Sequence, residues 1–454
     1  MDETSLAREL EGKFAGRLIG PGDAEYDEAR RIWNGMIDRR PALIAQCAAT
    51  SDVVAAVNLA REKGRVVAVR GGGHNVSGNA TCDDGVVIDL RLMKRVTVDP
   101  QNRIATAQGG VTWGEYDRQT QQHGLASPGG AISTTGIAGL TLGGGFGWLS
   151  RSYGLACDNL VSAEVVTAAG EVLTASANEN PDLFWGIRGG GGNFGVVTRF
   201  HYRLQRVGEL YAGLVLHPRS EAKEFLRMFR DLAALAPDEL SMMAAFLSSP
   251  EGDPVVGVFA VYHGSADEGQ RVLAPLRGFG SPLLDDIGPK PYTLVQQAFD
   301  EGFPAGHRNY WKSSYLSAIS DDCIDVLVEQ AHQAPSPMCL VAIEHMIGGA
   351  VARVGADETA FGSRDAEYNL LVLGMGDDPA IDGNLKTWAR SAWEAAQPFA
   401  TGGVYVNYMD GDESERIADA YGAEHYARLV ALKKRYDPEN LFRLNQNIAP
   451  AEDG

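Results

Sequence analysis

The stretch "AVRGGGHNVSG", residues 68–78, places three consecutive glycines directly after an apolar run and ends them on a histidine, His74. Glycine lets the backbone approach a ligand closely and leaves its N–H groups free to receive phosphate oxygens. Two further glycine runs follow in the same part of the chain, at residues 143–147 and 189–195. Three such runs, each beside an expected strand, predict a site for an extended anionic cofactor.

The composition is that of a globular protein. Of the 454 residues, 44% are hydrophobic and 22% are charged, enough for about two or three domain-sized units. Acidic residues outnumber basic ones by 59 to 40, for a formal net charge of −19. This balance argues against nucleic acid or an anionic membrane as the main partner. Because no long uncharged apolar run is present and the N-terminal "MDETSLARELEGKF" lacks the apolar core of a secretory signal, we expect no transmembrane helix and a cytoplasmic location.

The five cysteines are Cys47, Cys82, Cys157, Cys323 and Cys339. They are odd in number, scattered, and without a CxxC pair, so we expect neither a disulfide framework nor a metal site. Cys157 is expected to be a small buried apolar residue.

The local patterns indicate an α+β chain. Residues 50–64 predict a helix that Ser51 caps and Gly64 ends, and residues 65–70 predict the strand before the first glycine run. Residues 160–176 predict a hairpin that turns at an Ala-Gly pair.

Three later regions have patterns of their own. Residues 129–147 are dense in Gly, Ser and Thr, and are expected to be too small and flexible for ordinary core. Between residues 209 and 400, amphipathic helices alternate with strands, which predicts an antiparallel sheet with helices over one face. "YVNYMD" (405–410) is expected to be strand-like, and the following helix should end at Tyr436, before Pro438.

The glycine runs do not satisfy the rules for two common nucleotide sites. The Rossmann fingerprint needs G-x-G-x-x-G between a strand and a helix, but "NVSGNATCDDG" is loop-like and the run at 143–147 follows no convincing strand. No run contains G-K-[ST], so a P-loop is absent. An NAD-type dehydrogenase is therefore the poorer fit.

Several motifs in fixed order resemble those of a known family. "VRGGGHNVSG", "GLTLGGGFGWLSRSYGLACDNL", "NPDLFWGIRGGGGNFGVVT" and "YDPENLFRLNQNI" are similar to segments of the berberine bridge enzyme-like oxidoreductases, within the vanillyl-alcohol oxidase/para-cresol methylhydroxylase superfamily. The similarity extends from about residue 38 to residue 449. It implies an N-terminal segment (1–37), a two-part PCMH-type FAD-binding domain (38–208), a substrate-binding domain (209–400) and a C-terminal segment (401–454) that returns to the FAD domain.

The resemblance also implies how FAD is held. In that family the histidine after R-G-G-G bonds covalently to the 8α-methyl carbon of the flavin, so His74 is the expected attachment residue. Some relatives add a second bond through a cysteine, but here Ile132 or a neighbour occupies that place and Cys157 lies too far downstream. We therefore expect a single covalent bond.

The remaining candidates for cofactor contact come from the glycine-rich motifs and the C-terminal segment. They are Arg70, Gly71, Gly72, Gly73, Asn75, Ser77, Gly109, Thr134, Thr135, Gly136, Gly139, Gly143, Gly144, Gly145, Gly147, Asn193, Gly195, Val196, Val197, Tyr405, Asn407, Asn445 and Asn447.

Three residues are candidates for catalysis. Tyr408 lines up with a tyrosine base of some relatives, and we expect a buried phenol near the flavin to lose its proton more easily. Glu344 is the alternative base, and regular pairing would point it and His345 to opposite faces of their strand. Tyr153 is expected to point into the substrate cavity. Packing alone is the competing interpretation for the aromatic residues.

The implied activity is transfer of a hydride from a small organic substrate to FAD, which molecular oxygen reoxidises with formation of hydrogen peroxide. Oxidase rather than dehydrogenase behaviour is a family tendency. Alcohols, sugars, amines and polyketide-like compounds all stay open as substrates, as does the oligomeric state. The alternatives are an oxidative cyclase of secondary metabolism and a flavin-binding protein without turnover.

Overall fold

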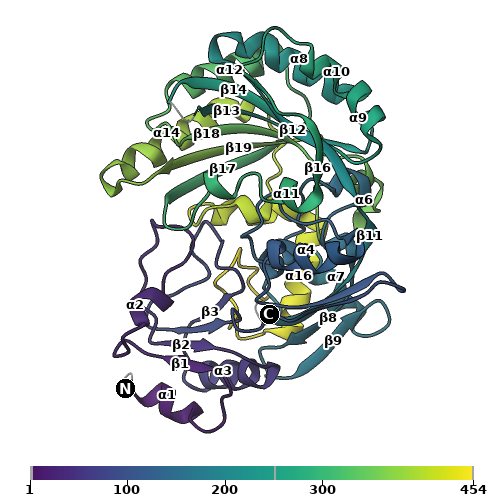
Figure 1. Cartoon of the computed structure of the whole chain (residues 1–454). Coiled ribbons are helices and arrows are strands. Elements are labelled where there is room, and N and C mark those ends of the chain that lie inside the picture. The colour runs from purple at the N-terminus through teal and green to yellow at the C-terminus, as the bar shows by residue number, and fades with distance from the viewer. Residues whose placement is uncertain (1–3, 250–251, 452–454) are drawn as a thin grey trace.

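The computed structural model describes residues 4–249 and 252–451, which form two halves (Figure 1). One half holds two smaller sheets and both ends of the described chain, and the other is a large sheet under a layer of helices. Antiparallel sheets combined with helices make the chain α+β, as predicted. Within the described residues no helix has both the length and the apolar character needed to span a membrane.

The first sheet has the strand order β1-β2-β4-β3. Its elements are β1 (Arg17–Ile19), β2 (Leu43–Gln46), β3 (Val67–Arg70) and β4 (Val86–Asp89), with α1 (Thr4–Leu10) and α3 (Thr50–Glu62) packed against it. Strands β2, β3 and β4 are parallel, so the first glycine run starts at the carboxyl end of β3.

The cap predicted for α3 at Ser51 is wrong: the buried carboxylate of Asp52 instead accepts the N–H groups of Ala48, at 2.9 Å, and Ala49, at 3.3 Å. Gly64 follows the helix with φ +59°, as predicted.

The second sheet is antiparallel, in the order β5-β6-β10-β8-β9, and contains the predicted hairpin. Its strands are β5 (Val96–Asp99), β6 (Ile104–Gln108), β8 (Leu160–Val166), β9 (Val172–Ser176) and β10 (Val196–Arg203). The helices of this part of the chain are α4 (Trp113–Thr120), α5 (Ile137–Leu142), α6 (Ser150–Tyr153) and α7 (Pro181–Gly186). A separate two-stranded ladder joins β7 (Leu125–Ala126) to β11 (Gln205–Arg206). Ile137 and Leu142 of α5 are buried. The expectation that residues 129–147 stay outside the core is therefore wrong for this helix. The many glycines on both sides of α5 dominate the composition of this stretch, so the few apolar side chains of the helix were not recognised in the sequence.

The large sheet is antiparallel throughout and follows the order β15-β12-β14-β13-β18-β19-β17, with β16 also paired to β12. Its strands are β12 (Glu209–Pro218), β13 (Leu240–Ser248), β14 (Pro254–Tyr262), β15 (Leu284–Asp285), β16 (Gly288–Pro291), β17 (Arg308–Leu316), β18 (Leu340–His345) and β19 (Tyr368–Gly376). The helices of this half are α8 (Ala222–Ala234), α9 (Ala266–Val272), α10 (Ala274–Arg277), α11 (Tyr292–Gln296), α12 (Asp321–His332), α13 (Ala350–Arg353) and α14 (Asp382–Ala396).

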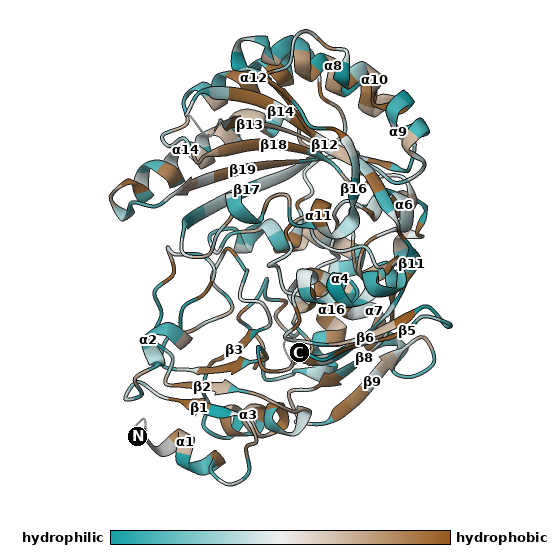
Figure 2. Ribbon diagram, viewed as in Figure 1, coloured by the Kyte–Doolittle hydropathy of each residue, from teal (hydrophilic) through white to brown (hydrophobic). Residues whose placement is uncertain are grey.

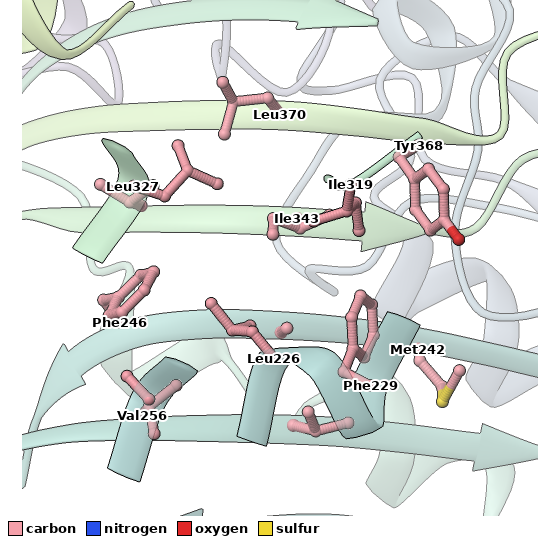
Figure 3. Close-up of a cluster of buried hydrophobic side chains, with 14 of the residues drawn as sticks. Leu226, Phe229, Met242, Phe246, Val256, Ile319, Leu327, Ile343, Tyr368 and Leu370 are labelled. Carbon is pink, nitrogen blue, oxygen red and sulfur yellow. The ribbon is translucent and has the colours of Figure 1, made fainter. Parts of the chain in front are cut away.

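The two faces of this sheet have different roles. Met242 and Phe246 of β13 point toward the helices, where they pack with Leu226 of α8 (Figure 3). Met243 and Ala245, the alternate residues of the same strand, line a cavity on the opposite face. The strands are mostly hydrophobic, while the covering helices alternate hydrophobic and hydrophilic surface (Figure 2). One face therefore builds the core and leaves the other free to form a site.

The C-terminal segment crosses between the halves. It begins with a single 3₁₀ turn, η8 (Val406–Tyr408), where we expected strand; helices α15 (Ile417–Tyr421) and α16 (Ala423–Tyr436) follow and pack into the core of the second sheet. The turn arises because the N–H of Tyr408 donates to the carbonyl of Tyr405, at 2.9 Å, and pairs with no strand. Helix α16 ends at Tyr436, as predicted.

The remaining short elements connect these units. They are α2 (Tyr26–Ala29), η1 (Gln121–His123), η2 (Cys157–Asn159), η3 (Arg219–Glu221), η4 (Asp300–Gly302), η5 (Ala356–Glu358), η6 (Pro379–Ile381), η7 (Gln397–Phe399) and η9 (Ser414–Arg416).

Candidate active site

One cavity of about 480 Å³ extends from the glycine runs to the open face of the large sheet. Its walls come from the two smaller sheets, the large sheet and the C-terminal segment. Fifteen of the sequence-predicted residues line it: Gly71, Gly72, Gly73, His74, Asn75, Thr135, Gly136, Gly139, Gly195, Val197, Glu344, Tyr405, Asn407, Tyr408 and Asn445. The structure thus brings together, around one space, residues that are more than 370 positions apart in the sequence.

The glycines around the cavity leave space that no protein atom fills. A Cβ added to Gly139 or Gly192 would meet no atom within 4 Å, although both residues border the cavity. A Cβ on Gly72 would instead lie 2.5 Å from the backbone nitrogen of Gly136, because the two backbones already touch there. Within the part of the chain that the structure describes, the N–H groups of Gly72, Gly73 and Gly192 donate no hydrogen bond. Walls without side chains and with free N–H donors fit an extended anionic ligand.

His74 stands at the end of the first glycine run. The Trp33 ring stacks on its imidazole, with 4.2 Å between the ring centroids and 20° between the planes, and its Nε2 atom lies 3.4 Å from the hydroxyl oxygen of Thr134. Burial lowers the pKa of His74 to about 4, so its imidazole is neutral at pH 7. A neutral imidazole keeps one ring nitrogen with a free electron pair, which is the form that can bond to a flavin carbon.

Eleven predicted cofactor residues do not border the cavity in the described part of the chain: Arg70, Ser77, Gly109, Thr134, Gly143, Gly144, Gly145, Gly147, Asn193, Val196 and Asn447. Several of them support its walls from behind. The fully buried guanidinium of Arg70 donates to the backbone carbonyls of Ala80, at 3.1 Å, and Ala29, at 2.5 Å. The sequence pattern does not separate a wall residue from one that holds the wall in place.

Asn193 attaches the C-terminal tail to the third glycine run. Its side-chain amide donates to the carbonyls of Gly190, at 2.9 Å, and Gln446, at 3.1 Å, and its Oδ1 accepts the N–H of Ile448 at 3.0 Å. The tail therefore closes the cavity beside the glycines. Asn445 on this tail lines the cavity, and its buried Oδ1 has no partner among the described residues. This oxygen is therefore available to accept a hydrogen bond from an N–H group of a ligand.

Lys433 of α16 also joins the third glycine run to the C-terminal tail. Its ammonium, which is fully buried, donates to the Asn193 carbonyl at 2.9 Å, the Phe442 carbonyl at 3.0 Å and the Asp437 carboxylate at 2.7 Å. Sequence analysis missed this residue because a lysine in the last turn of a helix is usually solvent-exposed.

Glu344 carries the ionisable group on the large-sheet side of the cavity. It lies on β18, opposite Asn369 of β19, whose side-chain amide donates to Glu344 Oε2 at 2.7 Å. The Tyr408 hydroxyl donates to Glu344 Oε1 at 3.1 Å. Burial raises the pKa of Glu344 to about 7, against the lowering effect of these two hydrogen bonds. His345 points to the opposite face, as predicted, where its ring lies against Tyr368.

Tyr408 does not have the acidic phenol that the sequence analysis expected. Burial, together with the neighbouring Glu344 carboxylate, raises its pKa well above the ordinary value of 10.0. Its phenol therefore keeps its proton at neutral pH and acts as a hydrogen-bond donor. Tyr405 packs against it, with 4.9 Å between the ring centroids, and accepts hydrogen bonds from the Gly145 N–H at 3.1 Å and the Asn407 amide at 2.8 Å.

Tyr153, the third catalytic candidate, lies apart from this pair. Its hydroxyl contacts His263 Nε2 at 3.3 Å, and the residue does not border the cavity. Cys157 is fully buried in an apolar cluster, as expected, and burial raises its thiol pKa well above the ordinary value. Ile132, which the resemblance places at or next to the second attachment position, lines the cavity.

Comparison with known proteins gives the family. Residues 41–176 match the family model for an FAD binding domain, and residues 404–449 match the model described as berberine and berberine like. (R)-6-hydroxynicotine oxidase of Paenarthrobacter nicotinovorans is 34% identical over 96% of this chain and 97% of its own. An FAD-linked oxidoreductase of Dictyostelium discoideum is 32% identical over 99% of this chain and 98% of its own.

Solved structures agree with this relationship. The crystal structure of 6-hydroxy-D-nicotine oxidase from Arthrobacter nicotinovorans superposes with a TM-score of 0.89 at 32% identity, covering 96% of this chain and 98% of that one. The xylooligosaccharide oxidase of Myceliophthora thermophila superposes with a TM-score of 0.85 at 25% identity, covering 100% of both chains. Two relatives are 32% and 34% identical to this chain over almost its whole length, and two family models match it. Together with the glycine-lined cavity, these matches show that this chain is a berberine bridge enzyme-like FAD-linked oxidoreductase.

Proposed function

We propose that this enzyme is an oxidase that removes a hydride from a C–H bond of a small organic substrate, with FAD attached to His74 and molecular oxygen as the final acceptor. Bound FAD would supply the hydride acceptor and the means of passing two electrons to oxygen, with formation of hydrogen peroxide. Relatives named for 6-hydroxynicotine and for xylooligosaccharides support an activity on small molecules or short oligomers.

The observation that carries the proposal is that His74 and Glu344 border the same cavity. One group is suited to hold the cofactor and the other to exchange a proton with a substrate, and both belong to one continuous space. The cavity residues near Glu344 include rings from β17 and η8, which leave few groups for water to bind. This favours chemistry protected from solvent.

In this proposal Glu344 is the base. Its Oε1 and Oε2 atoms each accept one hydrogen bond, from Tyr408 and Asn369, which orients the carboxylate toward the cavity. A carboxyl with a pKa of about 7 can accept a proton from a substrate and release it again near neutral pH. Tyr408 donates a hydrogen bond to the base, because its own phenol stays protonated. Tyr153 has no part in this step.

His74 holds FAD as the single covalent ligand. Support comes from its neutral imidazole beside the free N–H groups of the first glycine run, and from the absence of cysteine at position 132. Acid precipitation of the purified protein tests this directly. Yellow colour should stay in the pellet of the wild type and move to the supernatant in His74→Ala. Colour released from the wild-type protein would refute the covalent bond but leave FAD binding intact.

Proton transfer is tested with a peroxide-coupled substrate screen. For a substrate found in this way, Glu344→Gln should lower kcat by about 10²-fold or more, the usual size of a lost general base, whereas Tyr408→Phe should lower it less. Tyr153→Phe serves as the control and should keep wild-type kcat. Equal turnover by wild type and Glu344→Gln would contradict the assignment of the base.

A further inference from the structure

Trp33 covers one face of the histidine that ends the first glycine run. Its indole stacks on the His74 imidazole, with 4.2 Å between the ring centroids and 20° between the planes. Trp33 is buried and, in the part of the chain that the structure describes, it does not border the cavity, whereas His74 does. The indole therefore lies behind the imidazole and leaves the space for the ligand free.

Trp33 also holds the backbone that carries His74. Its backbone N–H donates at 3.0 Å to the carbonyl of Gly73, which belongs to the peptide bond between Gly73 and His74. Gly73 has a φ of +73°, in the left-handed region that residues with side chains rarely adopt. One residue thus contacts both the peptide bond before His74 and the ring of His74.

The orientation of the indole is set by the large-sheet half of the molecule. Its Nε1–H donates to the carbonyl of Phe303 at 3.1 Å, and the Trp33 carbonyl accepts the N–H of Gly306 at 2.8 Å. The indole also meets the ring of Trp311 on β17 edge to face, with 5.7 Å between the centroids. Because these contacts fix the indole, it cannot turn together with the imidazole.

A ring that has to form a bond needs a fixed plane. Rotation of the imidazole about its side-chain torsions moves both ring nitrogens, and a misplacement of about 1 Å can slow a reaction about 10²-fold. The polar contact of the imidazole with Thr134 is long, at 3.4 Å from Nε2, and orients the ring only weakly. The stacked indole is therefore the stronger restraint on the ring.

We propose that Trp33 is a positioning residue for covalent attachment, holding the His74 imidazole in the plane from which a ring nitrogen reaches the flavin methyl carbon. The inference rests on the proposed covalent bond at His74. In this step His74 loses its ring N–H proton and gains a bond to the 8α carbon, from which one hydrogen leaves. The two protons and two electrons released pass to molecular oxygen, which becomes hydrogen peroxide.

A time course of attachment tests the inference without requiring substrate turnover. Full-length protein is purified from flavin-limited cells, mixed with FAD in air, and sampled into acid. Flavin fluorescence of the denatured protein measures attached flavin, and absorbance of desalted native samples measures total bound flavin. Trp33→Leu should bind FAD as the wild type does but attach it about tenfold more slowly.

Two further variants separate the flat ring from the indole N–H. Trp33→Phe keeps an aromatic face but lacks the N–H, as Trp33→Leu does, and should attach FAD within about threefold of the wild-type rate. Trp33→Met fills the space with a flexible side chain and should be as slow as Trp33→Leu. It takes the place of the leucine variant if circular dichroism shows that variant to be unfolded.

Trp388→Leu is the matched control. Trp388 of α14 is 6% exposed, against 5% for Trp33, and it also donates its indole N–H to a backbone carbonyl, that of Gln330 at 2.9 Å. It packs in the core on the helix-covered face of the large sheet. This variant should keep the wild-type rate of attachment even where its Tm falls.

The outcomes separate this inference from the proposed function. Attachment at the wild-type rate in Trp33→Leu and Trp33→Met would overturn the inference, as would a Trp33→Phe variant as slow as Trp33→Leu. Loss of FAD binding in both nonaromatic variants would also overturn it, because Trp33 would then hold the whole site and not the ring. Flavin that acid releases from the wild type would overturn the covalent bond and this inference together. Slow attachment in the nonaromatic variants of an enzyme that releases no peroxide in the substrate screen would overturn the oxidase function alone.

Discussion

Replacing the Glu344 carboxylate should make the protein more stable while it removes the proposed base. The carboxyl is fully enclosed, and burial raises its pKa from the ordinary 4.5 to about 7 in the folded chain. A group with a raised carboxyl pKa holds its proton more tightly when folded than when unfolded. Folding stability therefore falls as pH rises from about 4.5 to about 7, and the loss is complete above that range.

The size of the effect follows from the two pKa values. A difference of about 2.5 pH units corresponds to about 3 kcal/mol at 1.36 kcal/mol per unit. Glu344→Gln keeps an acceptor for the Asn369 amide and nearly the same volume, but carries no charge at any pH. Stability and proton transfer therefore oppose each other at this position, as they commonly do in active sites.

Thermal unfolding at about pH 5 and at about pH 8.5 measures this effect. The Tm advantage of Glu344→Gln over wild type should be small at the lower pH and clearly larger at the higher pH. Glu329→Gln, a change at an exposed carboxylate on α12, should track the wild type at both values. If the wild type and Glu344→Gln differ by the same amount at both pH values, Glu344 does not titrate in the way the buried site requires.

Three further changes test the supports of the cavity. Gly72→Ala places a methyl group against the backbone of Gly136, so it should cost about 1–3 kcal/mol in thermal unfolding and lower the flavin content measured by absorbance. Asp437→Asn leaves the buried Lys433 ammonium without its charge partner and should destabilise the protein by about 3–5 kcal/mol, visible as a lower Tm. Lys312→Met frees the loop after Tyr408, because the buried Lys312 binds Asp412 at 2.6 Å; kcat should fall about tenfold while the acid-precipitated pellet stays yellow.

The parts of the site that could be predicted from sequence are those with a local signature. The glycine run before His74 marks close backbone contact, and the structure places that run at the end of a parallel strand, facing the cavity. Strand alternation was enough to put Glu344 and His345 on opposite faces. These inferences need only the conformational freedom of glycine and the period of a strand.

Partners across strands and between distant segments left no such signature. Asn369 meets Glu344 only through the register between β18 and β19, which a single sequence does not specify. Trp33 lies in an N-terminal segment that carried no motif, yet it stacks on His74. Lys312 lies on a strand without a motif, yet its buried ammonium lies between the Asp412 and Glu413 carboxylates.

Buried asparagines tie together the segments that surround His74 and Glu344. Asn34 donates its amide to the carbonyls of Val76, at 2.7 Å, and Asn309, at 2.8 Å, and so ties the histidine loop to the start of β17.

Asn193 acts in the same way at the C-terminal tail, because its amide donates to Gln446 and its Oδ1 accepts from Ile448. An amide with both donor and acceptor satisfied fixes one geometry, whereas an apolar contact would tolerate sliding. Asn369 holds Glu344 through its donor alone, since its Oδ1 has no partner among the described residues. Because a misplacement of about 1 Å can slow a reaction greatly, we infer that these amides hold the wall segments of the cavity in position, while the hydrophobic cores supply most of the stability.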